Sequence, residues 1–315
     1  MLIAAPERWD EACFAVPAVR AMVASGVDVG VLCAAEQRAF WRPLADLAVL
    51  DFPAKTKPRV LAAELAGKWQ AALLWEPGLA AEACLRAKIP RRLGPNDKAL
   101  KKYLTHPMPL AAAGRPLEHR VRHYLAAVQT LGLDTTRPEF FAPVALGVPR
   151  HPKSLLLCPE SDFGGSHEWL LERWIEVAQA LQAAGWTLTI AGRMEASRLA
   201  QMMLDGLGGE LAYCRMESLA SVLPVLAAQA LVLAADGSLP HVAAHVGTPC
   251  VTLFGPNDPA WKRPLGRSHA SVWRHVECAP CFFPKCPLDR RCQNELSVAR
   301  VLAAVEGHGR PASEF

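Results

Sequence analysis

The sequence predicts an α/β protein with two halves, each a parallel sheet whose strands are joined by helices. Three observations support this prediction. Short apolar runs alternate with amphipathic stretches up to about residue 140, the alternation restarts near residue 154, and a Pro/Gly-rich segment lies between the two series. Alternating strands and helices are typical of parallel sheets. A Pro/Gly-rich stretch without periodic apolar residues is typical of a linker.

The first half is expected to form one domain over residues 1–145. Strands and helices are distinguished here by the period of their apolar residues. The expected strands lie at residues 2–6 and 27–33, a strand end lies at 73–75, and the expected helices lie at 10–25 and 118–131. Prolines and glycines cluster from Pro138 to Pro152, which marks the linker.

The second half is expected to form another domain over residues 154–315. Its expected strands lie at residues 155–158, 186–191, 230–235 and 250–254, and its expected helices lie at 169–184 and 219–228, with a short helix before the last strand. Each expected helix falls between two expected strands, so the second half repeats the pattern of the first.

Composition limits the class of protein. A chain of 315 residues favours two domains, and 51% hydrophobic residues are enough for a large core. A net charge of +4 implies no global field for nucleic acid. No apolar run approaches the roughly 18–20 residues of a membrane span. The first residues lack the basic region and cleavage site of a signal peptide. We therefore expect a cytoplasmic protein.

The most informative segment lies between the expected strands at 230–235 and 250–254. Asp236, Gly237 and Ser238 directly follow the first of these strands. Open α/β sheets bind ligands at the carboxyl ends of their strands. A glycine there lets backbone approach closely, and the start of the next helix offers N–H groups to an anion. The Asp236 carboxylate suits sugar or ribose hydroxyls better than phosphate.

This segment resembles the signature of glycosyltransferase family 9, the ADP-heptose:lipopolysaccharide heptosyltransferases. The matching residues are Asp236, His241, Ala243-Ala244, Pro249 and the run from Gly255 to Pro259. Gly237 and Ser238 stand in swapped order relative to the usual hydroxyl-Gly pair. The resemblance extends from Pro6 to about Val305. It implies a GT-B fold, in which two Rossmann-like domains face each other across a cleft, with the acceptor on the first domain and the nucleotide-sugar on the second.

The resemblance also implies an activity. Members of the family transfer heptose, or a related sugar, from an ADP-sugar to an anionic lipopolysaccharide-type glycolipid, with inversion and without a metal or other cofactor. Two alternatives remain open for this chain. One is a GT-B transferase with another nucleotide-sugar donor, and the other is a non-catalytic relative that binds nucleotide or glycan.

A catalytic base is expected after the first strand. The family carries Leu-Gly-Asp there, with the aspartate six residues before a proline. Counting back from Pro17 gives Glu11, and Asp10 takes the glycine position. Inverting sugar transfer needs a base for the acceptor hydroxyl, so Glu11 or Asp10 is the candidate. The alternative is that both carboxylates only stabilise the start of the helix.

The nucleotide side is expected in residues 157–169, which resemble the family's phosphate-binding turn. His167 stands where the family has a lysine that neutralises the leaving diphosphate, and a protonated imidazole could replace it. The alternative is an exposed histidine at a helix start. The candidate nucleotide-sugar-binding residues are Ser161, Gly164, Gly165, His167, Glu195, Asp236, Gly237, Ser238 and His241. Glu195 and His241 could equally be a surface carboxylate and a histidine without a ligand.

A basic stretch in the first half is the candidate acceptor site. By the resemblance, this segment meets the carboxylates and phosphates of the acceptor. The candidates are Arg91, Arg92, Lys98 and Lys101. The same charges fit peripheral contact with the anionic inner membrane. The alternative is a solvated charged face.

Four of the ten cysteines cluster near the C-terminus, and the other six occur singly in apolar runs, as small core residues do. The cluster consists of Cys278, Cys281, Cys286 and Cys292. Four thiols within such a short segment are a candidate structural Zn or Fe–S site. The alternative is reduced or disulfide-linked packing. A nucleic-acid zinc module is disfavoured because Arg290 and Arg291 form only a thin basic patch there.

Overall fold

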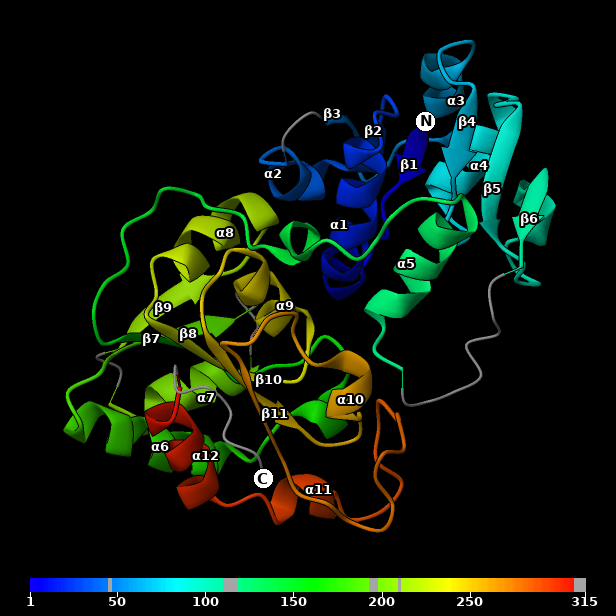
Figure 1. Ribbon diagram of the computed structural model, residues 1–315. Helices are drawn as coiled ribbons and strands as arrows, with labels where there is room; N and C mark the ends of the chain where they lie inside the picture. Colours follow the sequence, from blue (N-terminus) through cyan, green and yellow to red (C-terminus); the bar gives the residue numbers. More distant parts are fainter. Residues whose placement is uncertain (45–46, 110–117, 193–197, 209–210, 309–315) are drawn as a thin grey trace. The chain divides into compact units, whose positions relative to one another are not determined.

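The structure is a computed structural model that describes residues 1–44, 47–109, 118–192, 198–208 and 211–308 (Figure 1). The chain divides into two compact units, Met1–Ala142 and Pro143–Phe315. No helix among the described residues is both long and apolar enough to cross a membrane.

The first unit contains a six-stranded parallel sheet in the order β3-β2-β1-β4-β5-β6. Its strands are β1 (Leu2–Ala4), β2 (Gly30–Ala34), β3 (Ala48–Phe52), β4 (Ala71–Leu73), β5 (Arg91–Pro95) and β6 (His106–Met108). Its helices are α1 (Trp9–Ala24), α2 (Arg38–Trp41), α3 (Pro58–Leu65), α4 (Leu79–Arg86) and α5 (Val121–Thr130). The central strand β1 is fully buried, which explains its continuous apolar sequence.

The second unit contains another six-stranded parallel sheet, in the order β12-β11-β10-β7-β8-β9. Its strands are β7 (Ser154–Cys158), β8 (Thr187–Gly192), β9 (Ala212–Arg215), β10 (Leu231–Ala235), β11 (Cys250–Phe254) and β12 (Ala270–Trp273). Its helices are α6 (Leu171–Ala183), α7 (Arg198–Gly206), α8 (Leu219–Ala227), α9 (Ser238–His245), α10 (Pro259–Lys262), α11 (Arg291–Asn294) and α12 (Val298–Glu306).

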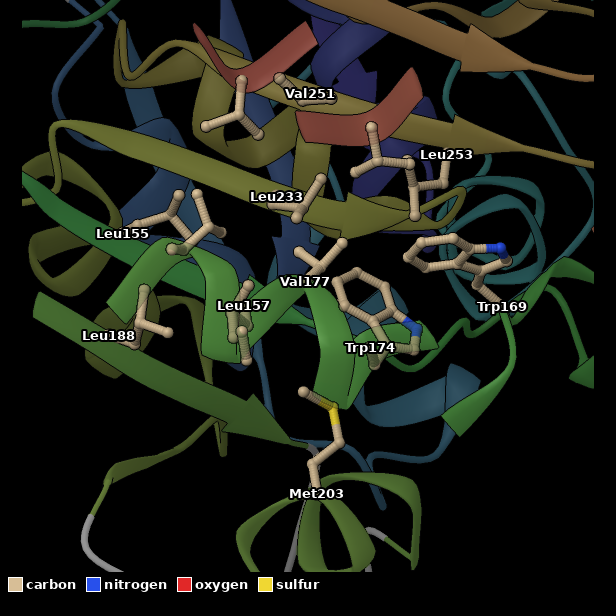
Figure 2. Packing of buried hydrophobic residues seen from close by; sticks show 14 of the residues in the cluster. Leu155, Leu157, Trp169, Trp174, Val177, Leu188, Met203, Leu233, Val251 and Leu253 are labelled. Carbon is tan, nitrogen blue, oxygen red and sulfur yellow. The ribbon is translucent and has the colours of Figure 1, made fainter. Parts of the chain in front are cut away.

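The core of the second unit lies between its sheet and helices α6, α7 and α12. Figure 2 shows leucines of β7, β10 and β11 packed with Trp169 and Trp174. The two indole rings meet edge to face with centroids 5.7 Å apart. Aromatic pairs of this geometry add to the stability that burial of apolar surface provides.

Both sheets have the same topology. Counted from β7, the second sheet repeats the strand order of the first. In each sheet, the first three strands in the sequence run from the centre to one edge of the sheet, and the next three run from the centre to the opposite edge. The reversal falls between β1 and β4 in the first unit and between β7 and β10 in the second. Ligands of open α/β folds bind outside the carboxyl ends of the strands at this point.

Most expected elements are present, with shifted ends. The strand expected at 2–6 ends at Ala4, the strand expected to begin at Val27 begins at Gly30, and the strand end expected at Trp75 falls at Leu73. The helix expected to begin at Trp169 begins at Leu171 instead. It starts later because a short 3₁₀ turn, η4 (Gly165–His167), precedes it and Leu170 is extended.

Candidate functional site

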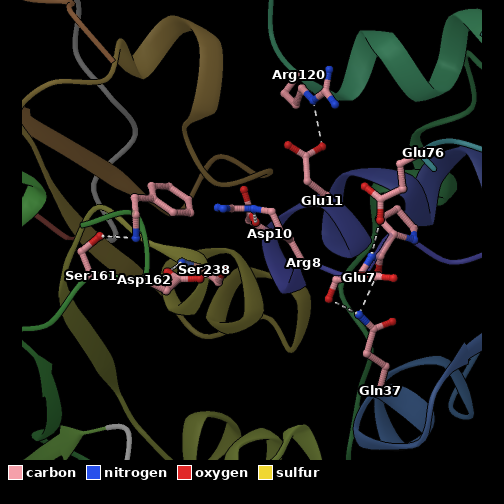
Figure 3. A network of polar contacts seen from close by, with 12 residues as sticks. Glu7, Arg8, Asp10, Glu11, Gln37, Glu76, Arg120, Ser161, Asp162 and Ser238 are labelled. Atoms are coloured by element: carbon pink, nitrogen blue, oxygen red, sulfur yellow. Dashed lines mark hydrogen bonds and ion pairs between the residues drawn. The ribbon is translucent and has the colours of Figure 1, made fainter. Parts of the chain in front are cut away.

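In the second unit, the loops after β7 and β10 contact each other at the reversal point of the sheet. The Ser161 hydroxyl donates to the carbonyl oxygen of Asp236 at 2.5 Å. Asp162 accepts two hydrogen bonds from Ser238, one from the backbone N–H at 2.8 Å and one from the hydroxyl at 2.6 Å (Figure 3). A carboxylate of the chain itself therefore binds at the start of α9, where the sequence suggested N–H groups open to an external anion.

Asp236 is the centre of a buried polar cluster at the end of β10. Its side chain is fully buried, and its Oδ2 atom lies 3.0 Å from Nδ1 of His167. The Asn257 amide donates to the same oxygen at 2.7 Å. Burial raises the pKa of Asp236, and the contacts with His167, Asn257 and Lys262 oppose that shift. His167 is thus a buried partner of Asp236 rather than an exposed residue at a helix start.

Two candidate glycines lie at points of close approach. A Cβ at Gly237 would lie 2.8 Å from Oδ1 of Asp162, so a larger residue there would displace the Asp162 side chain that binds Ser238. Gly164 has φ of +116°, and a Cβ there would collide with the carbonyl oxygen of Pro284. Both positions favour glycine for steric reasons.

The cysteine-rich segment contacts the loop after β7. The Ser166 N–H donates to the Pro284 carbonyl at 3.3 Å, and the Gln293 amide donates to the Ser166 carbonyl at 3.3 Å. The Cys281 N–H donates to the Pro256 carbonyl at 2.9 Å. The segment therefore supports the turn that carries Gly164, Gly165 and His167.

In the first unit, Glu11 lies in the first turn of α1, directly after β1. Its Oε2 atom accepts a hydrogen bond from Nε of Arg120 at 2.8 Å (Figure 3). The same oxygen accepts a hydrogen bond from the Tyr124 hydroxyl at 2.6 Å. The Glu11 side chain is 9% exposed. Sequence reasoning missed Arg120 and Tyr124, although the helix that carries them was expected.

Asp10 has a different environment from its neighbour. Its side chain is fully buried and accepts from Nε of Arg8 at 3.1 Å. The Glu76 carboxylate, in the loop after β4, accepts from the N–H of Glu7 at 2.7 Å. Burial raises the pKa of Glu76, and the Glu7 N–H opposes the shift. Glu76 was also missed, although it follows a recognised strand end and parallel strands end at a common edge.

The basic residues proposed for the acceptor do not gather at one place. Lys98 and Lys101 are exposed and follow the carboxyl end of β5. Arg91 and Arg92 lie at the amino end of that strand, away from the reversal-point loops. Arg92 donates to the carbonyls of Tyr103 at 2.7 Å and Ile89 at 2.6 Å, so it stabilises the local fold.

Two further candidates complete the nucleotide side. His241 is buried within α9, 2% exposed. Glu195 lies outside the described residues. Ser161, Gly164, Gly165, Gly237 and Ser238 all lie in the loops at the reversal point or at the start of α9.

All ten cysteines are free thiols. Among the described residues, no three His, Cys, Asp or Glu side chains are arranged to hold a metal ion. Cys292 is buried and Cys278 is exposed. Burial raises the pKa of Cys292 to about 11, and the other three thiols of the cluster act in the same direction. Of the six single cysteines, Cys214 is only half-buried because it lies on the edge strand β9.

Fold and loops together define a protein with two α/β units, each built on a parallel six-stranded sheet with polar loops at its reversal point. The chain belongs to glycosyltransferase family 9 (heptosyltransferase), whose family model matches residues 118–291, more than half of the chain. This membership confirms the resemblance seen in the sequence.

Relatives support the same family. Lipopolysaccharide heptosyltransferase 1 of Pseudomonas aeruginosa is 33% identical over 123 residues, which are 38% of this chain and 33% of that protein. The chain thus matches about a third of the length of this curated relative. The structure of E. coli heptosyltransferase WaaC with ADP superposes with a TM-score of 0.76 at 15% identity, covering 97% of this chain and 98% of WaaC.

A third similar structure is TibC from enterotoxigenic E. coli H10407, described as an iron-containing dodecameric glycosyltransferase. Its TM-score is 0.59 at 13% identity, and the match covers 97% of this chain and 75% of TibC. At these identities the structural matches show the fold alone. They confirm the expected α/β architecture with two Rossmann-like halves.

Proposed function

We propose that this protein is an inverting glycosyltransferase that moves heptose, or a related sugar, from an ADP-sugar to an anionic lipopolysaccharide-type glycolipid. The observation that carries the proposal is the position of Glu11 and Asp236. In a chain of this family, Glu11 lies in the first turn of α1 and Asp236 in the loop after β10, each at the reversal point of its own parallel sheet, where α/β folds bind ligands.

The second unit, residues 143–315, is proposed to bind the donor. Asp236 would accept hydrogen bonds from sugar or ribose hydroxyls. His167, adjacent to Asp236, would donate to the leaving diphosphate, and the N–H groups of Gly164 and Gly165 would contribute further donors. WaaC is known in complex with ADP, which supports an adenine nucleotide here.

The first unit, residues 1–142, is proposed to supply the base and bind the acceptor. The acceptor oxygen attacks the anomeric carbon while the bond to the β-phosphate oxygen breaks, so ADP leaves from the opposite face. Glu11 takes the proton of the acceptor hydroxyl, and the diphosphate retains the electron pair of the broken bond. This sequence of steps requires no metal.

Lys98 and Lys101 are the basic residues best suited to an anionic acceptor. Both are exposed near the carboxyl end of a strand, whereas Arg91 and Arg92 lie at the other end. The same exposed lysines would allow peripheral contact with an anionic membrane surface.

One observation favours the alternative of a different donor or a relative without turnover. The Asp162 carboxylate binds the Ser238 N–H at 2.8 Å, and a negative charge there opposes a diphosphate. The test of function must therefore begin with the nucleotide itself.

The test is calorimetric titration of the protein with ADP, UDP and GDP, followed by ADP-heptose. Selective ADP binding that weakens in both Asp236→Asn and Asp236→Ala supports the proposal. Asp205→Asn, which alters an exposed carboxylate on α7, is the matched control. Preference for UDP or GDP assigns another donor, and absence of nucleotide binding assigns a non-catalytic relative.

Transfer is then measured with a heptose-free lipopolysaccharide acceptor. The Glu11→Gln variant keeps the shape of the side chain but cannot take a proton. We expect its turnover to fall by about 100-fold or more with ADP binding retained. Equal turnover in the variant would eliminate Glu11 as the base.

The cysteine segment is proposed as a structural element rather than a catalytic one. Cys278, Cys281, Cys286 and Cys292 carry the sulfur ligands that Zn²⁺ and iron prefer, although no three of these described side chains are arranged to hold a metal as they stand. A bound metal would fix the segment that supports Ser166. Metal analysis of protein purified under reducing conditions tests this: about one zinc or iron per chain supports a structural site, and none supports reduced packing.

A further inference from the structure

We propose that Arg120 and Tyr124 are positioning residues that orient the Glu11 carboxylate for proton abstraction. This inference rests on the proposed function, because it assumes that Glu11 is the base. It concerns Arg120 at the N-cap of α5 and Tyr124 within α5, which lie 109 and 113 positions further along the chain than Glu11.

The first argument is geometric. Arg120 lies at the N-cap of α5, and Tyr124 lies four residues later, on the same face of the helix. Both donate to one oxygen of Glu11, at 2.8 Å and 2.6 Å. Two donors that converge on a single carboxylate oxygen fix the position of that oxygen and restrict the rotamers of the side chain.

The second argument concerns the donors themselves. The Tyr124 ring meets Trp75 edge to face with centroids 4.9 Å apart. The Arg120 guanidinium lies 5.6 Å from the centre of the Tyr124 ring. Phe14, one turn after Glu11 on α1, meets the His119 ring edge to face with centroids 5.4 Å apart. The donors are thus held by packing on either side of the polar contact.

The third argument is the length of the glutamate side chain. Glutamate has one more rotatable bond than aspartate and extends further, so a free glutamate would sample more positions. An error of about 1 Å in the position of a reacting group can reduce the rate about 100-fold. Two anchors on Oε2 remove that freedom.

The charges that face Glu11 agree with this role. Burial raises the pKa of Tyr124 well above its usual value, so its hydroxyl remains a donor. Burial, followed by the charge of Arg120, lowers the pKa of His123 to about 4, so this ring is neutral at pH 7. Charged groups near Glu11 include Arg120 at the N-cap of α5, Glu76 after β4 and Asp10 on α1 itself.

The test is the pH profile of kcat/KM for the wild type and for Arg120→Gln, Arg120→Lys and Tyr124→Phe. Loss of the guanidinium removes a charge that favours the ionised carboxylate. The acid limb of Arg120→Gln should therefore move to higher pH by about one unit. Arg120→Lys keeps the charge and should restore the limb, with kcat still reduced because an ammonium lacks the planar fork. Tyr124→Phe should lower kcat about tenfold.

Arg122→Gln is the matched control. Arg122 is exposed on the same helix, so this variant removes an equal charge without touching Glu11 and should keep the wild-type profile. The affinity for ADP should be unchanged in all variants, and thermal unfolding reports whether each one folds. If both Arg120 variants are unstable, Tyr124→Phe, the mildest change, tests the positioning role instead.

The outcomes separate this inference from the proposed function. Sugar transfer with a shifted acid limb in Arg120→Gln supports both. Transfer with an unmoved limb, or with losses of activity that only follow losses of stability, overturns the positioning role and leaves the proposed function intact. If the wild type transfers no sugar from any donor, the proposed function fails and the inference fails with it.

Discussion

Glu11 and Asp10 are neighbours in the sequence, and the structure gives them different partners. The distance from Pro17 predicted Glu11 as the base, but local sequence could not predict which side chains contact each carboxylate. Glu11 binds Arg120 and Tyr124, whereas Asp10 is fully buried beside Arg8. Of the two carboxylates, only Glu11 retains exposed surface, 9% of its side chain, which agrees with its proposed role as the base.

Asp162 determines how readily an anion can bind at the start of α9. Asp162→Asn keeps an oxygen that can accept from the Ser238 N–H but removes the negative charge. We expect it to bind ADP about three- to tenfold more tightly, because a carboxylate no longer competes with the diphosphate. Calorimetric titration against wild type and Asp205→Asn measures the effect. Unchanged or weaker ADP binding would show that Asp162 does not compete with the nucleotide.

Glu76 offers a pH-dependent test in the first unit. Burial raises its pKa above the usual value near 4.5, so its charged form is disfavoured by folding. Its contribution to stability is present below that usual value and is lost as pH rises through the raised pKa. Glu76→Gln, which never ionises, should raise Tm at pH 7 by about 1–3 °C and have no effect near pH 4. An equal change at both pH values would contradict this account.

At the scale of elements, long apolar strands were the easiest to predict. β11 matches its expected range, and β7 and β10 differ by one residue from theirs, because fully buried strands read as continuous apolar runs. The edge strand β9 carries exposed residues and has no such pattern. The turn at η4 could not be predicted, since contacts with the cysteine-rich segment shape it.

Gly164 tests that turn. Gly164→Ala combines a positive φ with a collision against Pro284, and we expect it to lower the free energy of unfolding by about 1–3 kcal/mol. Gly208→Ala is the matched control, with φ of +83° and no atom within 4 Å of the added Cβ, and should cost about 1 kcal/mol. Urea unfolding compares them. Equal losses of unfolding free energy in the two variants would mean that the segment at Pro284 moves aside to accommodate the added Cβ.

At the scale of the whole molecule, the repeated strand order is the main structural finding. The restart of the pattern near residue 154 indicated two halves, and the topology shows that each has its reversal point between its first and fourth strands. The loops that meet there are far apart in sequence, for example Asp162 and Ser238, 76 residues apart.

Hydrogen exchange with and without ADP tests which unit binds the nucleotide. Saturating ADP, at about 100 times its Kd, should stabilise the bound state by about 2.7 kcal/mol. We expect protection in peptides that cover residues 159–168 and 236–241, because the first carries the Gly164 and Gly165 N–H groups and the second carries Asp236, which are the proposed contacts of the nucleotide-sugar. Protection confined to the first unit would contradict the proposal that the second unit binds the nucleotide.

The sequence by itself determined the α/β class, the two halves, the family signature around Asp236 and the position of Glu11. These follow from hydrophobic period and fixed spacing, which are local properties. Only the tertiary structure decided that Arg120 and Tyr124 bind Glu11, that Asp162 binds at the start of α9 and that His167 faces Asp236. Such contacts arise because parallel sheets bring distant loops to one edge, and no local propensity encodes which side chains meet there.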